Sequence, residues 1–109
     1  MKQEPNKLVR NKIPSILKEQ GYKVKAKKIK EDADFEQALR DKIVEEVKEL
    51  ASSTSKEQMV EEIADVLEVI DSLLKATGAT MKEVKQAKKT KKSEKGGFSA
   101  RKLLVSYEN

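Results

Sequence analysis

The chain of 109 residues contains no cysteine and no histidine. Without cysteine it has no disulfide, no thiolate nucleophile and no cysteine-based zinc or iron–sulfur site. Without histidine it lacks the commonest general base and the commonest transition-metal ligand. Carboxylates, lysines and arginines are therefore the main groups from which a functional site can be built.

Long apolar runs are also missing, and only four residues are aromatic. No apolar segment approaches the length that crosses a bilayer. The opening residues, MKQEPNKLVR, lack the apolar stretch of a signal peptide. We therefore expect one small cytoplasmic domain over residues 1–109, with no membrane partner.

The net charge of +5 conceals a strong segregation. Residues 31–71 hold fourteen acids and four bases, a net charge of −10, whereas the remainder holds twenty bases and five acids, a net charge of +15. A purely nucleic-acid-binding protein has little use for such an acidic centre. A protein that holds a metal ion and a polyphosphate together has a use for both parts.

The basic arm, residues 1–30, is expected to contain a short helix from about Pro14 to Gln20. Proline suits the first turn of a helix, and Gly21 suits its end. After it, YKVKAKKIK alternates apolar and basic residues, which fits either an extended segment or a solvated linker.

An acidic helical hairpin is predicted over residues 31–78. Its first helix starts at an N-cap, Asp32 or Asp34, and ends in the SST turn at 52–54. Ser55 and Gln58 form a capping box that starts the second helix, which Gly78 ends. The short turn indicates antiparallel packing. The apolar positions are Phe35, Leu39, Ile43, Val47 and Leu50, then Met59, Ile63, Val66, Leu67, Ile70, Leu73 and Leu74.

A basic helix and tail are predicted over residues 79–109. Thr80 and Glu83 form a second capping box, and Gly96-Gly97 ends the helix. We expect the apolar tail to dock and Phe98 to anchor it in the core.

The predicted fold class is thus all-α. Val66 and Val69 widen the apolar arc of the second hairpin helix beyond one stripe. A hairpin alone does not cover so wide an arc, so we expect a homo-oligomer, either dimer or tetramer, that completes a four-helix bundle.

Two pairs of carboxylates are candidate metal ligands, because each pair shares one helical face at a spacing of three. They are Glu46 with Glu49, and Glu62 with Asp65. Across an antiparallel seam the two pairs can face each other, and their repulsion calls for a cation. Oxygen ligands without histidine or cysteine select Mg²⁺, Mn²⁺ or Ca²⁺.

The alternative is that these carboxylates are solvated surface groups. On spacing alone, four carboxylates are assigned to the solvated surface, namely Glu45, Glu57, Glu61 and Asp71. Lys48 is a candidate to neutralise the first pair.

The string EEVKE at residues 45–49, followed by EIAD at 62–65, resembles the EExxE…ExxD signature of MazG-like all-α nucleoside triphosphate pyrophosphohydrolases. The segments EEIADVLEVIDSLL, LVRNKIPSIL and KKSEKGGF are similar to a small branch often labelled phosphoribosyl-ATP pyrophosphohydrolase-like. The resemblance implies Mg²⁺-dependent cleavage of a nucleoside triphosphate to monophosphate and pyrophosphate. It makes Glu46, Glu49, Glu62 and Asp65 the metal ligands, and Glu45 an outer-shell partner or the catalytic, water-orienting base.

Basic residues are candidates to bind the substrate. Arg10 and Lys12 offer charge for phosphate, and Asn11 offers hydrogen bonds to a base or ribose. The spacing of Lys88, Lys92 and Lys95 places them on one helical face. For each lysine, a solvated surface is the alternative.

Two other functions remain open at this point. One is phosphoribosyl-ATP hydrolysis in histidine biosynthesis, and the other is non-catalytic binding of nucleotides or nucleic acid by the basic arms. The acidic middle and the lack of interleaved aromatics disfavour nucleic acid. No EF-hand loop is present to indicate a calcium sensor.

Overall fold

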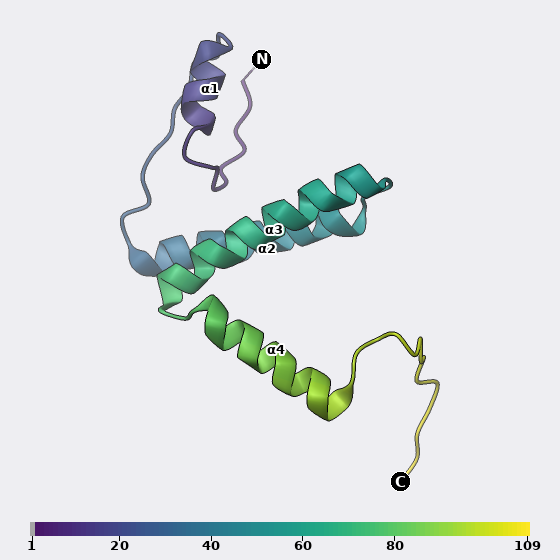
Figure 1. Ribbon diagram of the computed structural model, residues 1–109. Helices are drawn as coiled ribbons and strands as arrows, with labels where there is room; N and C mark the ends of the chain where they lie inside the picture. The colour runs from purple at the N-terminus through teal and green to yellow at the C-terminus, as the bar shows by residue number, and fades with distance from the viewer. Residues whose placement is uncertain (1) are drawn as a thin grey trace. The chain divides into compact units, whose positions relative to one another are not determined.

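The computed structural model describes residues 2–109, and within that range the chain forms four helices and no strand (Figure 1). These are α1 (Ile13–Glu19), α2 (Asp32–Ala51), α3 (Lys56–Thr77) and α4 (Met81–Lys95). The all-α prediction is confirmed. The chain divides into two compact units between Gly78 and Ala79. The first unit holds α1 to α3, and the second holds α4 and the tail.

Helix α1 carries Pro14 in its first turn, where the missing amide hydrogen costs no helical hydrogen bond. Gly21 follows the helix with φ +94°, a conformation that favours glycine. The segment after it, up to residue 31, has no regular structure. Of the two readings that the sequence left open, the irregular linker is the one observed.

Helix α2 begins at Asp32, where a start was predicted, but neither Asp32 nor Asp34 caps it. Its N-cap is Glu31, which is extended and makes no capping hydrogen bond with its side chain. Asp32 and Asp34 lie inside the first turn instead. There their negative charges interact favourably with the positive end of the helix dipole, so they stabilise the start without capping it.

Helix α3 begins after the predicted N-cap, Ser55, and one of the two hydrogen bonds of the predicted capping box is present. The Ser55 hydroxyl accepts a hydrogen bond from the backbone amide of Gln58 at 3.1 Å. The Gln58 side chain, however, accepts from the backbone amide of Thr54 at 3.1 Å. Gly78 ends the helix in the left-handed conformation, with φ +77°.

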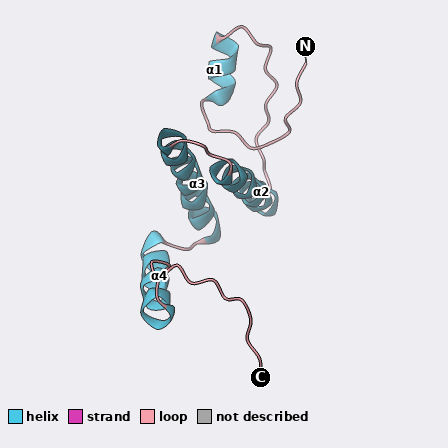
Figure 2. Cartoon of the chain, turned by 90° about the vertical axis from the view of Figure 1, so that its right-hand side faces the viewer, coloured by secondary structure: helices cyan, strands magenta, loops and turns pink. Residues whose placement is uncertain are grey.

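Helices α2 and α3 form an antiparallel hairpin and lie side by side in both views (Figures 1 and 2). Among residues 2–109 the buried apolar side chains are Leu39 of α2 and Val69 of α3. Leu39 belongs to the predicted stripe, and Val69 belongs to the wider arc of the second helix. The hairpin therefore has a very small core of its own.

Much of the predicted apolar surface of the hairpin is exposed. Five expected core residues are 36–49% exposed, namely Phe35, Val47, Met59, Ile63 and Leu67. Packing α2 against α3 buries one edge of each stripe and leaves the rest in contact with solvent.

The second unit is built on local interactions. The Thr80–Glu83 capping box is complete: the Thr80 hydroxyl accepts from the Glu83 amide at 3.2 Å, and the Glu83 carboxylate accepts from the Thr80 amide at 3.0 Å. Helix α4 ends at Lys95, is capped by Gly96 and has no buried residue. Phe98 is 97% exposed, so its predicted burial is wrong for this chain. Helix α4 buries none of its side chains, so it offers Phe98 no core to join.

Candidate metal centre

Three carboxylates converge on the seam between α2 and α3. Glu46 and Glu49 come from α2 and Glu62 comes from α3, and one oxygen of each lies within 4.8 Å of the other two. The spacing of three puts Glu46 and Glu49 on one face of α2, and the antiparallel hairpin brings the face of α3 that carries Glu62 opposite to it. The structure therefore gathers three of the four predicted metal ligands.

Glu46 is the unusual member of this acidic cluster (Glu46, Glu49 and Glu62). It is only 6% exposed, and its Oε1 forms an ion pair with Lys42 at 3.3 Å. Its Oε2 is buried without a hydrogen-bond partner, and so is Oε2 of Glu62. Burial, and then the nearby charge of Glu49, raise the pKa of Glu46 above its ordinary value. A buried carboxylate with an unpartnered oxygen is costly unless a cation reaches it.

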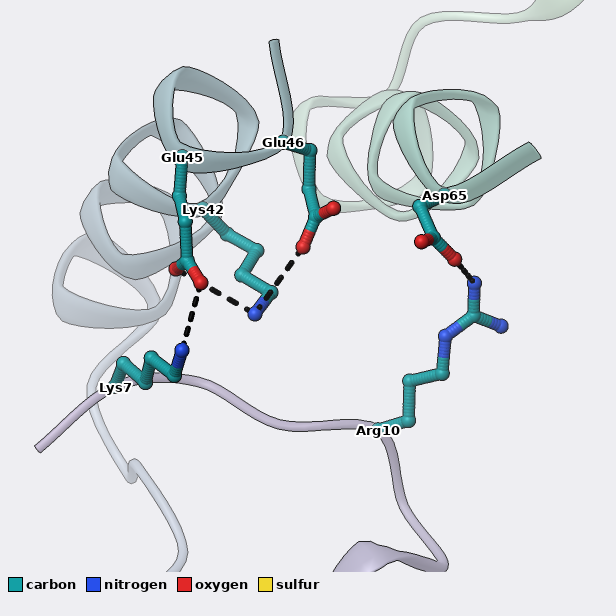
Figure 3. Close-up of polar contacts among 6 residues, drawn as sticks. All are labelled: Lys7, Arg10, Lys42, Glu45, Glu46 and Asp65. Atoms are coloured by element: carbon teal, nitrogen blue, oxygen red, sulfur yellow. Dashed lines mark hydrogen bonds and ion pairs between the residues drawn. The ribbon is translucent and has the colours of Figure 1, made fainter. Parts of the chain in front are cut away.

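Glu45 has a different environment on the next position of α2. Its carboxylate accepts a hydrogen bond from Lys7 at 2.7 Å and lies 3.5 Å from the ammonium of Lys42 (Figure 3). The hydrogen bond from Lys7 is the main cause that lowers the pKa of Glu45. Spacing alone assigned Glu45 to a solvated surface, but the structure shows a half-buried, doubly paired carboxylate.

Asp65, the fourth predicted ligand, is paired with an arginine. The Arg10 guanidinium donates a hydrogen bond to its Oδ1 at 2.8 Å (Figure 3). Asp65 lies one turn beyond Glu62 on α3, so this ion pair borders the acidic cluster. The arm that carries Lys7 and Arg10 passes both helices and reaches α2 with one residue and α3 with the other.

The donor set of the cluster fits a hard divalent cation. Its ligand atoms are all carboxylate oxygens, which Mg²⁺, Mn²⁺ and Ca²⁺ prefer. Mg²⁺ commonly binds through few carboxylates and completes its shell with water and substrate phosphates. The unpartnered oxygens of Glu46 and Glu62 are available for such an ion without breaking any hydrogen bond that they make.

The other predicted binding residues take no part in the ion pairs described above. Asn11 and Lys12 are exposed just before α1. Lys88, Lys92 and Lys95 are exposed on α4, in the second unit.

Sequence reasoning missed two basic residues of the site. Lys42 precedes Glu46 by four positions, a spacing typical of helical ion pairs, and it takes the role expected of Lys48. That signal was present in the sequence. Lys7 is 38 residues away from Glu45, and no local pattern links the two.

Comparisons of this chain with protein-family models, with curated proteins and with solved structures give no match. Across residues 2–109, no helix combines the length and apolar character needed to cross a membrane.

Proposed function

We propose that this protein is a Mg²⁺-dependent nucleotide pyrophosphohydrolase, with Mn²⁺ as an alternative ion. It would cleave a nucleoside triphosphate with water to give a nucleoside monophosphate and pyrophosphate. The observation that carries the proposal is the convergence of Glu46, Glu49 and Glu62, with a 94% buried Glu46 whose second oxygen has no partner. The resemblance of the acidic motifs to the MazG-like enzymes adds the reaction type.

The proposed chemistry needs little from the protein beyond charge and alignment. A bound divalent ion would neutralise phosphate charge and lower the pKa of a bound water. The chain has no cysteine or histidine nucleophile, and this reaction requires none. The clustered carboxylates would hold the ion, and Asp65 is the fourth candidate ligand beside them.

Glu45 is the proposed water-orienting carboxylate. In the metal-free protein the hydrogen bond from Lys7 lowers the pKa of Glu45, which is ionised at neutral pH and accepts hydrogen bonds. A carboxylate with a low pKa is a weak base. We therefore assign to Glu45 mainly the orientation of the attacking water, with the proton passing to it or to solvent.

We also propose that the folded unit is a homo-oligomer. The hairpin exposes Val44, Val47, Met59, Val60 and Leu67, each 41–54% exposed. Such a set of large apolar side chains is typical of an interface. A second copy that packs its own hairpin on this surface would complete a four-helix bundle, as a dimer or within a tetramer.

The substrate class includes canonical and damaged nucleotides, and phosphoribosyl-ATP is the alternative. We favour a general nucleotide role over the biosynthetic one, because the resemblance is to the small branch. The proposed substrates are cytoplasmic metabolites, so the proposal places the protein in the cytoplasm.

The proposal is tested by pyrophosphate release from a panel of nucleoside triphosphates and phosphoribosyl-ATP. Purified protein should release pyrophosphate with Mg²⁺ and lose this activity in excess chelator. Turnover that continues undiminished in chelator would contradict the metal assignment. Absence of turnover across the whole panel, together with salt-sensitive binding of DNA or RNA, would favour the non-catalytic alternative.

A further inference from the structure

The N-terminal strap, residues 7–10, joins the two helices of the hairpin through its charged side chains. Lys7 bonds Glu45 of α2, and Arg10 bonds Asp65 of α3 (Figure 3). Leu8, between them, is half-buried. The strap therefore runs beside the seam that holds the acidic cluster and supplies one positive charge to each side of it.

The strap charges lie within the field of the candidate metal ligands. The hydrogen bond with Glu45 is the main cause that raises the pKa of Lys7, and the charges of Glu49 and Glu46 raise it further. Lys7 thus interacts with two members of the acidic cluster as well as with its direct partner. In this structure the strap and Lys42 balance part of the negative charge of the seam.

Both ion pairs of the strap are accessible to solvent, which makes them easy to exchange. The side chains of Lys7 and Arg10 are 47% and 57% exposed. Exposed ion pairs of this kind contribute little to stability. A divalent cation at the cluster would repel both strap cations and compete with Arg10 for Asp65.

We propose that Lys7 and Arg10 are exchangeable counter-ions of the acidic seam: a divalent cation displaces them from the carboxylates, and they then bind phosphate oxygens of the substrate. The inference rests on the proposed metal site and adds to it the residues that bind the polyphosphate. Arginine suits the second role because its guanidinium forms paired hydrogen bonds with phosphate. The strap thus balances carboxylate charge before the metal arrives and phosphate charge afterwards.

The test is calorimetric titration of the full chain, first with Mn²⁺ or Mg²⁺ alone and then with magnesium tripolyphosphate, a ligand without a base. In Arg10→Gln the competing cation is gone, so the dissociation constant for the metal alone should fall about two- to fivefold. Binding of magnesium tripolyphosphate should weaken in the same variant, because a phosphate ligand is lost. Lys7→Gln should change both affinities in the same directions.

A matched control removes an equal charge from the same arm. Lys2 forms an ion pair with Glu4 at 3.2 Å, and neither residue contacts the helices through that pair. Lys2→Gln should leave both affinities within experimental error of the wild type. Arg10→Lys keeps the charge without the paired hydrogen bonds, so it should retain the wild-type metal affinity and bind tripolyphosphate less tightly.

A double-mutant cycle locates the competition. In an Asp65→Asn background, Arg10→Gln should no longer tighten metal binding, because the shared carboxylate has lost its charge. Circular dichroism of every variant shows whether it is folded, and Lys7→Gln, which also removes a strap charge, replaces Arg10→Gln if the latter is not.

The outcomes distinguish a failure of the proposed strap role from a failure of the proposed metal site. An Arg10→Gln variant that binds metal as the wild type does, or less tightly, overturns the exchange, and so does unchanged tripolyphosphate affinity. If the wild type binds metal and the strap variants bind it equally well, the proposed role of the strap is refuted and the metal site is not. Absence of metal binding in the wild type and in all variants overturns the strap and the metal site together.

Discussion

Replacing Glu46 by glutamine should stabilise the metal-free protein. The substitution keeps the length of the side chain and removes a charge that is 94% buried and has an unpartnered oxygen. A buried ion costs more than a buried neutral amide, and the nearby charge of Glu49 adds repulsion to that cost. The variant loses the ion pair with Lys42, but an i,i+4 pair is worth only about 0.3–0.5 kcal/mol. Lys42 also keeps Glu45 as a partner at 3.5 Å.

The balance favours the variant by about 1 kcal/mol in chelator. For a domain of this size that corresponds to a rise of roughly 4 °C or more in the melting temperature. Added Mg²⁺ should raise the melting temperature of the wild type and have a smaller effect on Glu46→Gln, because one metal ligand is lost. Thermal melts followed by circular dichroism, with chelator and with Mg²⁺, measure both effects.

The pH dependence gives the prediction a definite sign. The pKa of Glu46 is raised above its ordinary value of 4.5, so the folded state binds this proton more tightly than the unfolded state. The wild type therefore loses stability as the pH rises from about 4.5 through the folded pKa. The advantage of Glu46→Gln should be smallest near pH 4.5 and grow as the pH rises.

Glu61→Gln is the matched control, because Glu61 is exposed on α3 and the same charge is removed. We expect it to shift stability by no more than roughly 0.5 kcal/mol. The reasoning fails if Glu46→Gln melts at or below the wild type in chelator, or if its advantage shrinks with rising pH.

Three further predictions concern activity, charge pairing and assembly. Glu62→Gln should lower pyrophosphate release by orders of magnitude while stability in chelator holds or rises by about 1 kcal/mol; full activity would remove Glu62 from the site. Lys7→Gln should destabilise the folded protein at neutral pH, and this destabilisation should disappear as the pH falls through the lowered pKa of Glu45. Thermal melts at several pH values measure it, and a destabilisation independent of pH would contradict the pairing. Sedimentation at micromolar concentration should give a mass above the 12.3 kDa of one chain, whereas a stable monomer would contradict assembly; Val47→Glu, at an exposed apolar position, should shift the mass toward the monomer.

The helices could be predicted from the sequence because their signals are local. The Thr80–Glu83 capping box and the glycine stop at Gly78 involve residues a few positions apart, and both were found as expected. The start of α2 was less certain, because acids near a helix start can either cap it or interact with its dipole. Asp32 and Asp34 do the latter.

The acidic cluster could be predicted in part. Helical spacing placed Glu46 and Glu49 on one face, and the short turn brought Glu62 opposite to them. The pairing of Asp65 with Arg10 depends on the path of the N-terminal segment that carries Arg10, and helical spacing does not determine that path. The exposure of Phe98 likewise depends on what surface is available to receive it.

The lysine content of α4 makes its order sensitive to ionic strength. The helix carries seven lysines and two glutamates in fifteen residues, and none of its side chains is buried. Its stability thus rests on the capping box and intrinsic helix propensity, set against mutual repulsion of the lysines. The screening length is about 10 Å at 0.1 M salt and about 3 Å at 1 M, while side chains on successive turns are about 5–6 Å apart, so raising the salt concentration weakens that repulsion. The helical content of this segment should therefore rise with salt, the opposite of the response expected where an ion pair provides the stability.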